Sequence, residues 1–163
     1  MNVSDIKTLY RYNDWANALI FTAITKLPEE AVKRDLGGSL PSLRDVVAHN
    51  ITAEWAWLER WHGVNPTERP AWITDAVPSL IGHLEEIETK RNRFLESLSD
   101  ADLPVDRSIV YLSGKPDTQR LQDMLVHVVN HSTYHRGQIT LMFRQLGHAP
   151  PSTDFVAFRA ETR

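Results

Sequence analysis

Apolar residues recur every three or four positions through four long stretches of the chain, with polar and charged residues between them. That spacing places the apolar side chains on one face of an α-helix, which has about 3.6 residues per turn. Four amphipathic helices in one chain predict an all-α fold, in which the apolar faces meet in a four-helix bundle. The helices are expected at residues 4–27, 42–61, 79–98 and 118–147.

The ends of these helices carry local signals. Ser42 is followed three residues later by Asp45, a pattern that resembles a capping box at a helix start. Thr118 is a suitable N-cap for the last helix, and Gly147 is typical of the residue that follows a helix. Between the last two helices, residues 107–112 are β-branched in part and precede Ser-Gly-Lys-Pro. This segment is expected to form either a short hairpin arm or an irregular loop.

Two further segments are expected to lack regular structure. Residues 62–77 form a long, proline-containing connection between the second and third helices. The tail that follows the prolines at 150–151 is expected to be extended, with Phe155 and Phe158 free to pack back on the bundle.

The composition is that of an ordinary folded protein, with 42% hydrophobic and 24% charged residues among 163. A chain of this length fits one domain, so residues 1–163 are expected to form a single unit. The 21 acidic residues outnumber the 18 lysines and arginines, so the chain lacks the net positive charge that binds a phosphate backbone. Nucleic acid is therefore not an expected partner.

The absence of cysteine rules out disulfides, thiolate ligands and a cysteine nucleophile. Any metal must be held by nitrogen and oxygen atoms. The N-terminal residues lack the basic start and apolar core of a secretion signal, and no apolar run approaches the roughly 20 residues that span a bilayer. A cytoplasmic protein without membrane contact is expected.

Three histidines, His127, His131 and His135, follow one another at four-residue intervals in the last predicted helix. A four-residue step rotates by only about 40° around the helix, so neighbouring imidazoles lie on one face. Two such imidazoles can bind one divalent ion through neutral nitrogen at roughly 2.0–2.1 Å. The alternative is that they are surface or hydrogen-bonded histidines without a metal.

A pair at His131 and His135 would leave an ion under-coordinated, so a further ligand must come from another helix. His49, near the centre of the second predicted helix, is the best placed, although it could equally be a half-exposed histidine at the flank of the apolar stripe. His127 could act as a proton relay or hydrogen-bond partner of the site, or be a buried histidine with its own acceptor. The remaining histidines are expected to face water, and they are His62, His83 and His148.

Several segments, present in the right order, make the sequence resemble the DinB family of damage-inducible, YfiT-like bacterial proteins. The most specific element is the histidine-arginine-glycine-glutamine run at residues 135–138. The resemblance covers nearly the whole chain. The segments that carry it are Tyr12-Asn13-Asp14-Trp15-Ala16-Asn17, Ser42-Leu43-Arg44-Asp45-Val46-Val47-Ala48-His49, residues 127–139 and Asp154-Phe155.

The resemblance implies a four-helix bundle in up-down-down-up order, often a homodimer, that holds a divalent metal through three histidines. Carried over position by position, the ligands fall on His49, His131 and His135. Family members of known chemistry are thiol-dependent transferases and isomerases. The implied partners are therefore a low-molecular-weight thiol and a small electrophilic substrate, and the metal could be zinc, nickel, manganese or iron.

Three neutral imidazoles leave at least one coordination position open, which is the arrangement expected of a catalytic site. The leading hypothesis is a metal-dependent enzyme of hydrolase or thiol S-transferase type, with no catalytic residue identified. A second hypothesis is a metal-binding stress-response protein without turnover, its ion closed by a fourth side chain such as Glu54. A third is a metal-free dimerisation module, which requires His49 to lie far from the other two histidines.

Other residues near the histidines have simpler expected roles. Gly137 costs about 1 kcal/mol relative to alanine in mid-helix, which suggests a close approach by another helix or a ligand. Arg136 and Gln138 are expected to anchor neighbouring helices or the tail. The tryptophans of the second helix are expected to be core or dimer contacts rather than a substrate wall, and they are Trp55, Trp57 and Trp61.

Overall fold

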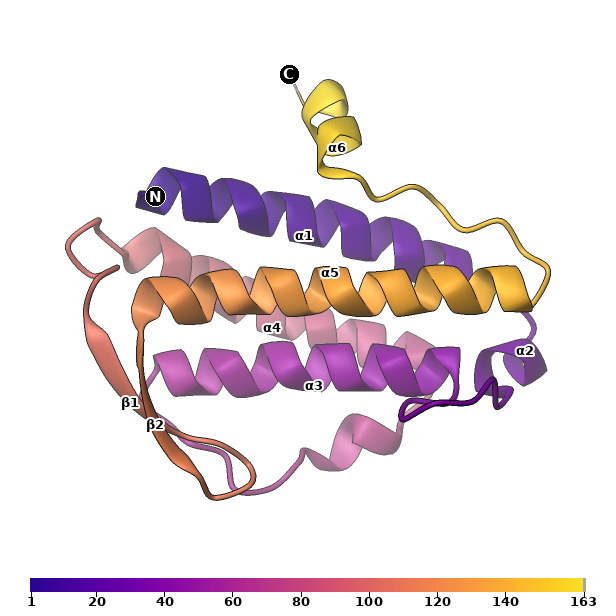
Figure 1. Cartoon of the computed structure of the whole chain (residues 1–163), viewed down its shortest axis with the longest axis horizontal. Coiled ribbons are helices and arrows are strands. Elements are labelled where there is room, and N and C mark those ends of the chain that lie inside the picture. The colour runs from indigo at the N-terminus through magenta and orange to yellow at the C-terminus, as the bar shows by residue number, and fades with distance from the viewer. Residues whose placement is uncertain (163) are drawn as a thin grey trace.

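The computed structural model describes residues 1–162, which form six α-helices, one 3₁₀ helix and a two-stranded sheet. In chain order these elements are α1 (Val3–Ile24), α2 (Glu29–Lys33), α3 (Leu43–Trp61), η1 (Ala71–Thr74), α4 (Val77–Ser97), β1 (Asp106–Val110), β2 (Pro116–Arg120), α5 (Leu121–Gln145) and α6 (Phe155–Glu161). The long helices α1, α3, α4 and α5 lie side by side, with α3 against both α4 and α5, and α1 against α5 (Figure 1). The prediction of a mainly helical bundle is confirmed.

The predicted helix ends agree with the structure at two important places. The Ser42 hydroxyl accepts the backbone N–H of Asp45 at 3.2 Å and donates to the Asp45 carboxylate at 2.6 Å, so α3 is capped where the sequence indicated. Gly147 has a φ of +80° and donates its N–H to the carbonyl of Arg144 just beyond the end of α5. A glycine is favoured there because other residues adopt this left-handed conformation only at a cost.

The segment before α5 is an antiparallel hairpin, the first of the two alternatives that the sequence left open. Thr118 pairs with Ser108 in this ladder, so the expected helix start at Thr118 is wrong and α5 begins at Leu121 instead. The backbone of β2 forms its hydrogen bonds across the ladder rather than along a helix. Ile109 on β1 is 1% exposed and attaches the hairpin to the core.

The C-terminal segment folds into α6, so the expectation of an extended tail is wrong. Phe158 is buried, and its ring lies 5.8 Å from Tyr12 and 5.7 Å from Trp15 of α1, measured between centroids. The Tyr12 hydroxyl also donates to the carbonyl of Thr153 at 2.9 Å. The predicted packing of Phe158 on the bundle is confirmed, and this tertiary contact stabilises a helix too short to form alone.

The connection between α3 and α4 is largely irregular, as predicted, but includes η1. Arg44 on α3 holds this segment against the bundle, because its guanidinium donates to the carbonyls of Ile73 and Asp75. The segment therefore forms a wall beside α3. Every helix within residues 1–162 is too short or too polar to cross a membrane.

Candidate metal centre

Three imidazoles converge between α3 and α5, one from α3 and two from α5. The Nε2 atom of His131 lies 3.3 Å from Nε2 of His49 and 3.1 Å from Nε2 of His135. One ligand atom from each of the three residues lies within 4.8 Å of the others. Two nitrogens bonded to one ion at roughly 2.0–2.1 Å would be separated by roughly 3–3.4 Å. The donor set therefore fits a shared divalent ion.

The helices place these side chains by simple geometry. α5 carries His131 and His135 one turn apart on the face that packs against α3, and α3 presents His49 from the opposite side. Val47 on α3 and Val128 on α5, close in sequence to these histidines, are almost fully buried. The sequence-predicted ligands are thus brought together, with His49 and His131 half-buried and His135 buried.

Gln138 orients one of the three imidazoles. Its side-chain oxygen lies 2.6 Å from Nδ1 of His135. An amide oxygen can only accept, so Nδ1 carries the proton in this contact and the Nε2 lone pair faces the cluster. Gln138 was expected to anchor another helix or the tail, and that interpretation is wrong. The three-residue spacing from His135 is the sequence signal that would have indicated this contact.

The surroundings keep the imidazoles neutral. Burial lowers the pKa of His131 to about 3, and the neighbouring His135 adds to the effect. Burial also lowers the pKa of His49, and the charges of His135 and Arg69 lower it further. Metal binding requires deprotonated imidazole nitrogen, so the three side chains are in the form that coordinates an ion at neutral pH.

The other histidines lie outside the cluster. His127 is exposed and rests against Trp57 with ring centroids 4.8 Å apart, so its interpretation as a buried histidine is wrong. His62 and His148 are exposed, as expected. His83 is half-buried rather than facing water, because its ring stacks on that of Trp72 at 4.9 Å.

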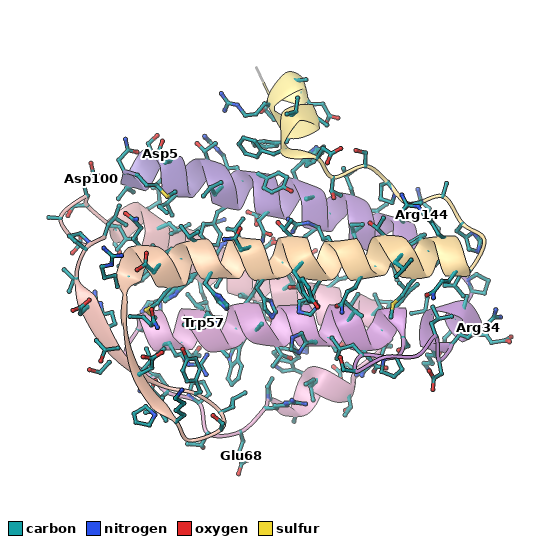
Figure 2. The ribbon with its side chains drawn as sticks, viewed as in Figure 1. Asp5, Arg34, Trp57, Glu68, Asp100 and Arg144 are labelled. Atoms are coloured by element: carbon teal, nitrogen blue, oxygen red, sulfur yellow. The ribbon has the colours of Figure 1, made fainter. Side chains whose placement is uncertain are left out.

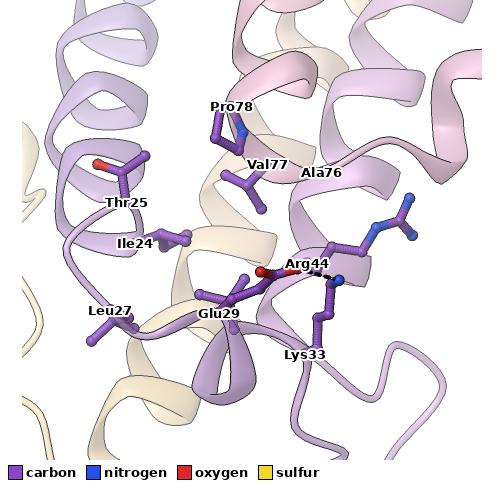
Figure 3. Close-up of a pocket in the computed structure, with 10 residues that line it drawn as sticks. Ile24, Thr25, Leu27, Glu29, Lys33, Arg44, Ala76, Val77 and Pro78 are labelled. Atoms are coloured by element: carbon purple, nitrogen blue, oxygen red, sulfur yellow. Dashed lines mark hydrogen bonds and ion pairs between the residues drawn. The ribbon is translucent and has the colours of Figure 1, made fainter.

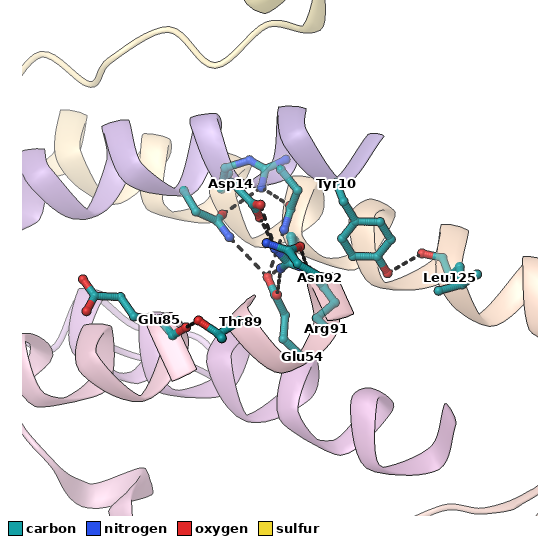
Figure 4. Close-up of polar contacts among 12 residues, drawn as sticks. Tyr10, Asp14, Glu54, Glu85, Thr89, Arg91, Asn92 and Leu125 are labelled. Atoms are coloured by element: carbon teal, nitrogen blue, oxygen red, sulfur yellow. Dashed lines mark hydrogen bonds and ion pairs between the residues drawn. The ribbon is translucent and has the colours of Figure 1, made fainter. Parts of the chain in front are cut away.

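Glu54, the side chain considered as a closing ligand, belongs to a different group. Its carboxylate accepts hydrogen bonds from the side chains of Asn13, Asn17 and Ser132 and pairs with Arg91 at 3.1 Å (Figure 4). Among residues 1–162, the metal-ligand cluster contains the three histidines and no carboxylate. One coordination position would therefore be left for a ligand from outside the chain.

Arg136 is the second buried cation of this polar group. Its guanidinium donates to the side-chain oxygens of Asn13 at 2.7 Å and Asn17 at 2.9 Å. Arg136 therefore joins α5 to α1, which confirms the expectation that it anchors a neighbouring helix.

A cleft of about 390 Å³ lies beside His49, between α3, η1 and the loop that joins α2 to α3. Trp57 on α3, labelled in Figure 2, forms part of its wall. The expectation that the tryptophans are core contacts is confirmed for the buried Trp61, whereas Trp57 contributes to both core and cleft. Trp55 is half-buried and its ring faces that of Trp72 at 6.4 Å.

A second hollow lies where the end of α1, α2 and the start of α4 meet (Figure 3). Its volume is about 280 Å³, and its lining residues include no histidine. Glu29 and Lys33 at its rim pair with each other. This hollow carries none of the donor atoms that mark the cleft beside His49.

Comparison with known proteins relates the fold to a family. The model of the DinB family matches residues 1–163. Protein DinB of Bacillus subtilis (strain 168) is 31% identical over an aligned region that covers 90% of this chain and 89% of the relative.

Two solved structures share the fold. A DinB-like protein from Bacillus cereus ATCC 10987 matches with a TM-score of 0.69 at 18% identity, covering 93% of this chain and 97% of that chain. The second is YfiT from Bacillus subtilis, which is described as a probable metal-dependent hydrolase with an unusual four-helix bundle topology. It matches with a TM-score of 0.69 at 19% identity, covering 88% of this chain and 86% of that chain.

Proposed function

Because the chain belongs to the DinB family, we propose that it is a metal-dependent enzyme in which His49, His131 and His135 hold a divalent ion. The observation that carries this proposal is the approach of three Nε2 atoms to a common point, with separations of 3.1 and 3.3 Å along two sides. A small-molecule substrate would enter through the cleft whose wall includes His49.

The side chains of this protein would prepare the site in three ways. Burial keeps the imidazoles neutral, Gln138 fixes the tautomer of His135, and Glu54 is held away by Arg91. A bound zinc, nickel, manganese or iron ion would supply a Lewis acid that polarises a carbonyl or promotes loss of a thiol proton. An open position beside a cleft favours turnover over storage of the ion.

Two reaction types are compatible with this arrangement. Hydrolysis is supported by the description of the similar YfiT structure. Transfer of a low-molecular-weight thiol to a small electrophile is supported by the family resemblance and by the absence of cysteine, which means that any reacting sulfur must arrive from outside. In that reaction the sulfur forms a bond to carbon, the leaving group departs with the bond electrons, and the thiol proton passes to solvent.

Several broader features belong to the same proposal. One buried apolar cluster draws on all four long helices, which supports a single domain over residues 1–163. In Figure 1 the residue numbers rise in one direction along α1 and α5 and in the other along α3 and α4, which supports the up-down-down-up order. A homodimer and a role in stress response rest on the family resemblance, and the cytoplasmic location expected from the sequence belongs to the same proposal.

The alternatives have less support. A metal-binding protein without turnover would be favoured by closure of the site, but Glu54 is engaged elsewhere. A metal-free dimerisation module requires His49 to lie far from the α5 pair, whereas the ligand atoms lie within 4.8 Å of one another.

Elemental analysis of the purified protein tests the metal site. The wild type should contain about one equivalent of divalent metal, and a triple substitution of His49, His131 and His135 to alanine should remove it. The matched control replaces His62, His83 and His148, three histidines outside the cluster, and should retain the metal. Equal metal content in the wild type and the site variant would refute the proposal.

The chemistry is tested with chlorodinitrobenzene and several low-molecular-weight thiols, and in parallel with ester and amide substrates. Turnover should fall on addition of a chelator and return with zinc or nickel. Turnover that persists unchanged in chelator, and equally in the site variant, would contradict a metal-dependent mechanism.

A further inference from the structure

Arg60, near the end of α3, is a buried cation without a matching anion. It is 5% exposed, and its Nε–H donates to the carbonyl of Val110 at 3.3 Å. Within residues 1–162 its two terminal amino groups donate no hydrogen bond to the protein and no carboxylate lies within 4.0 Å. Arg91, which is 1% exposed, contrasts with this, because it pairs with both Glu54 and Asp14.

The environment of Arg60 makes this unpaired charge costly. Its guanidinium lies 5.0 Å from the ring centre of Trp57 and 5.8 Å from that of Tyr111, so aromatic faces replace part of its water. Burial lowers the pKa of Arg60. A desolvated guanidinium gains more from a bound anion than an exposed one, because the partner offsets a desolvation cost that has already been incurred.

Arg60 lines the same cleft as His49, the one candidate ligand that reaches its wall. Arg60 and His49 both line it, and their separation of eleven residues is close to three helical turns, or roughly 16 Å of rise along one face of α3. The Arg60 guanidinium lies over the ring of Trp57, which precedes it by three residues on the His49 side of α3. On α3 between them the cleft is lined by Thr52, Ala53, Ala56 and Trp57, of which only Thr52 has a polar side chain.

The other charged side chains of the cleft separate into two groups. Arg44 and Asp45 pair with each other at 3.1 Å, so neither is free to bind a ligand. Arg69 is exposed in the wall, and its charge is close enough to lower the pKa of His49. The cleft therefore carries an excess of positive charge at Arg60 and Arg69.

We propose that Arg60 binds a carboxylate of the substrate, while the reacting end of the same molecule lies at the three histidines. The substrate class is a carboxylate with an apolar body long enough to cover the wall between them. This inference rests on the proposed function, because it takes the histidine cluster as the reacting end.

A structural role for Arg60 is the competing explanation, since its bond to Val110 also attaches the hairpin to α3. The two explanations differ in what happens when the charge is removed. Loss of an anchor should weaken folding and the binding of every ligand, whereas loss of an anion contact should weaken only ligands that carry the carboxylate.

Two hydroxamates of equal length separate these effects in the zinc-loaded protein. Octanohydroxamate carries a neutral tail, and suberic acid monohydroxamate carries a carboxylate at the far end. By calorimetry, Arg60→Gln should reduce affinity for the carboxylate-bearing probe at least tenfold and change affinity for the neutral probe less than twofold. Arg11→Gln removes an exposed charge on α1, outside the cleft, and should alter neither. An equal loss of affinity for both probes in Arg60→Gln would overturn the proposal.

A metal-free measurement distinguishes failure of this inference from failure of the proposed function. Titration of the chelator-treated protein with octanoate and octanamide, followed by NMR, should show octanoate binding that Arg60→Gln abolishes. If zinc does not bind but octanoate does, the metal proposal fails and the carboxylate site stands. If both hydroxamates bind equally well to wild type and Arg60→Gln, the metal proposal stands and the carboxylate site is refuted.

Discussion

The contact between Gln138 and His135 shows how one amide fixes the tautomer and orientation of a candidate metal ligand. Replacing Gln138 with leucine removes the acceptor at 2.6 Å from Nδ1, so the His135 ring loses both its fixed tautomer and its orientation. Outer partners of this kind change metal affinity by about 10–100-fold. We expect a loss of that size for Gln138→Leu, measured by competition with a zinc-binding dye. Gln145→Leu, at the exposed end of the same helix, is the control and should have no effect. Unchanged zinc affinity in Gln138→Leu would show that Gln138 does not orient the ligand.

Gly137 lies beside these residues but has no close neighbour. The sequence suggested a close approach by another helix or a ligand, yet the residue is exposed and an added Cβ would meet nothing within 4 Å. Within the described chain no helix approaches it, so that part of the prediction is wrong. Gly137→Ala should therefore raise the free energy of unfolding by about 0.5–1 kcal/mol, through higher helix propensity.

Urea denaturation checks this value, and Gly82→Ala provides a matched control, since Gly82 is also exposed in a long helix with open space around it. Both substitutions should stabilise the protein. A gain at Gly82 with a loss at Gly137 would mean that a second molecule covers α5 at this point.

At the scale of elements, the buried polar group connects all four long helices. Arg91 on α4 pairs with Glu54 on α3 and Asp14 on α1, and Glu54 accepts from Ser132 on α5. Arg91→Met would leave the Glu54 carboxylate buried without its ion-pair partner, with hydrogen bonds from uncharged side chains only. Breaking a buried pair in this way costs about 3–5 kcal/mol.

The free energy of unfolding of Arg91→Met, measured in urea, tests this cost. Lys7→Met removes one partner of the exposed pair with Glu96 and should cost no more than about 1 kcal/mol. Similar values for the two variants would mean that the buried group contributes little beyond a surface ion pair.

Elements were predictable from sequence where local chemistry decides their conformation. The Ser42 cap and Gly147 mark helix ends by contacts within a few residues, and both were identified. Thr118 was misassigned because its pairing with Ser108 across the hairpin outweighs its preference for a helix N-cap. The helix around Phe158 was missed because it depends on packing against α1, which no local pattern reveals.

The residues of the candidate site were likewise predictable where contacts within one helix decide their positions, and not where contacts between helices do. The pair His131 and His135 follows from four-residue spacing within one helix, whereas the choice of His49 needed a resemblance to a family as well as its position. The unpaired state of Arg60 and the engagement of Glu54 could not be predicted, because each depends on which groups from other helices lie within about 4 Å.

For the whole molecule, burying three imidazoles makes stability depend on pH when no metal is bound. An unfolded His131 takes up a proton near its ordinary pKa of 6.5, whereas the folded side chain resists protonation down to a pKa of about 3. Between these values the unfolded state binds more protons, so acidification from about pH 6.5 favours unfolding. The destabilising effect of His131 protonation vanishes above pH 6.5, where His131 is neutral in both the folded and the unfolded state.

Another group acts in the opposite sense, so a variant is needed to isolate His131. Burial raises the pKa of Glu88 from 4.5 to about 7, and stability from this carboxyl is lost as pH rises through that range. We therefore expect chelator-treated His131→Gln to lose less stability than the wild type between pH 7 and pH 5, in urea denaturation at each pH. His148→Gln, which replaces an exposed histidine, should follow the wild type. Parallel curves for wild type and His131→Gln would mean that the imidazole of His131 titrates alike in the folded and unfolded chains, so the buried cluster would not be held in its neutral, metal-binding form by the fold.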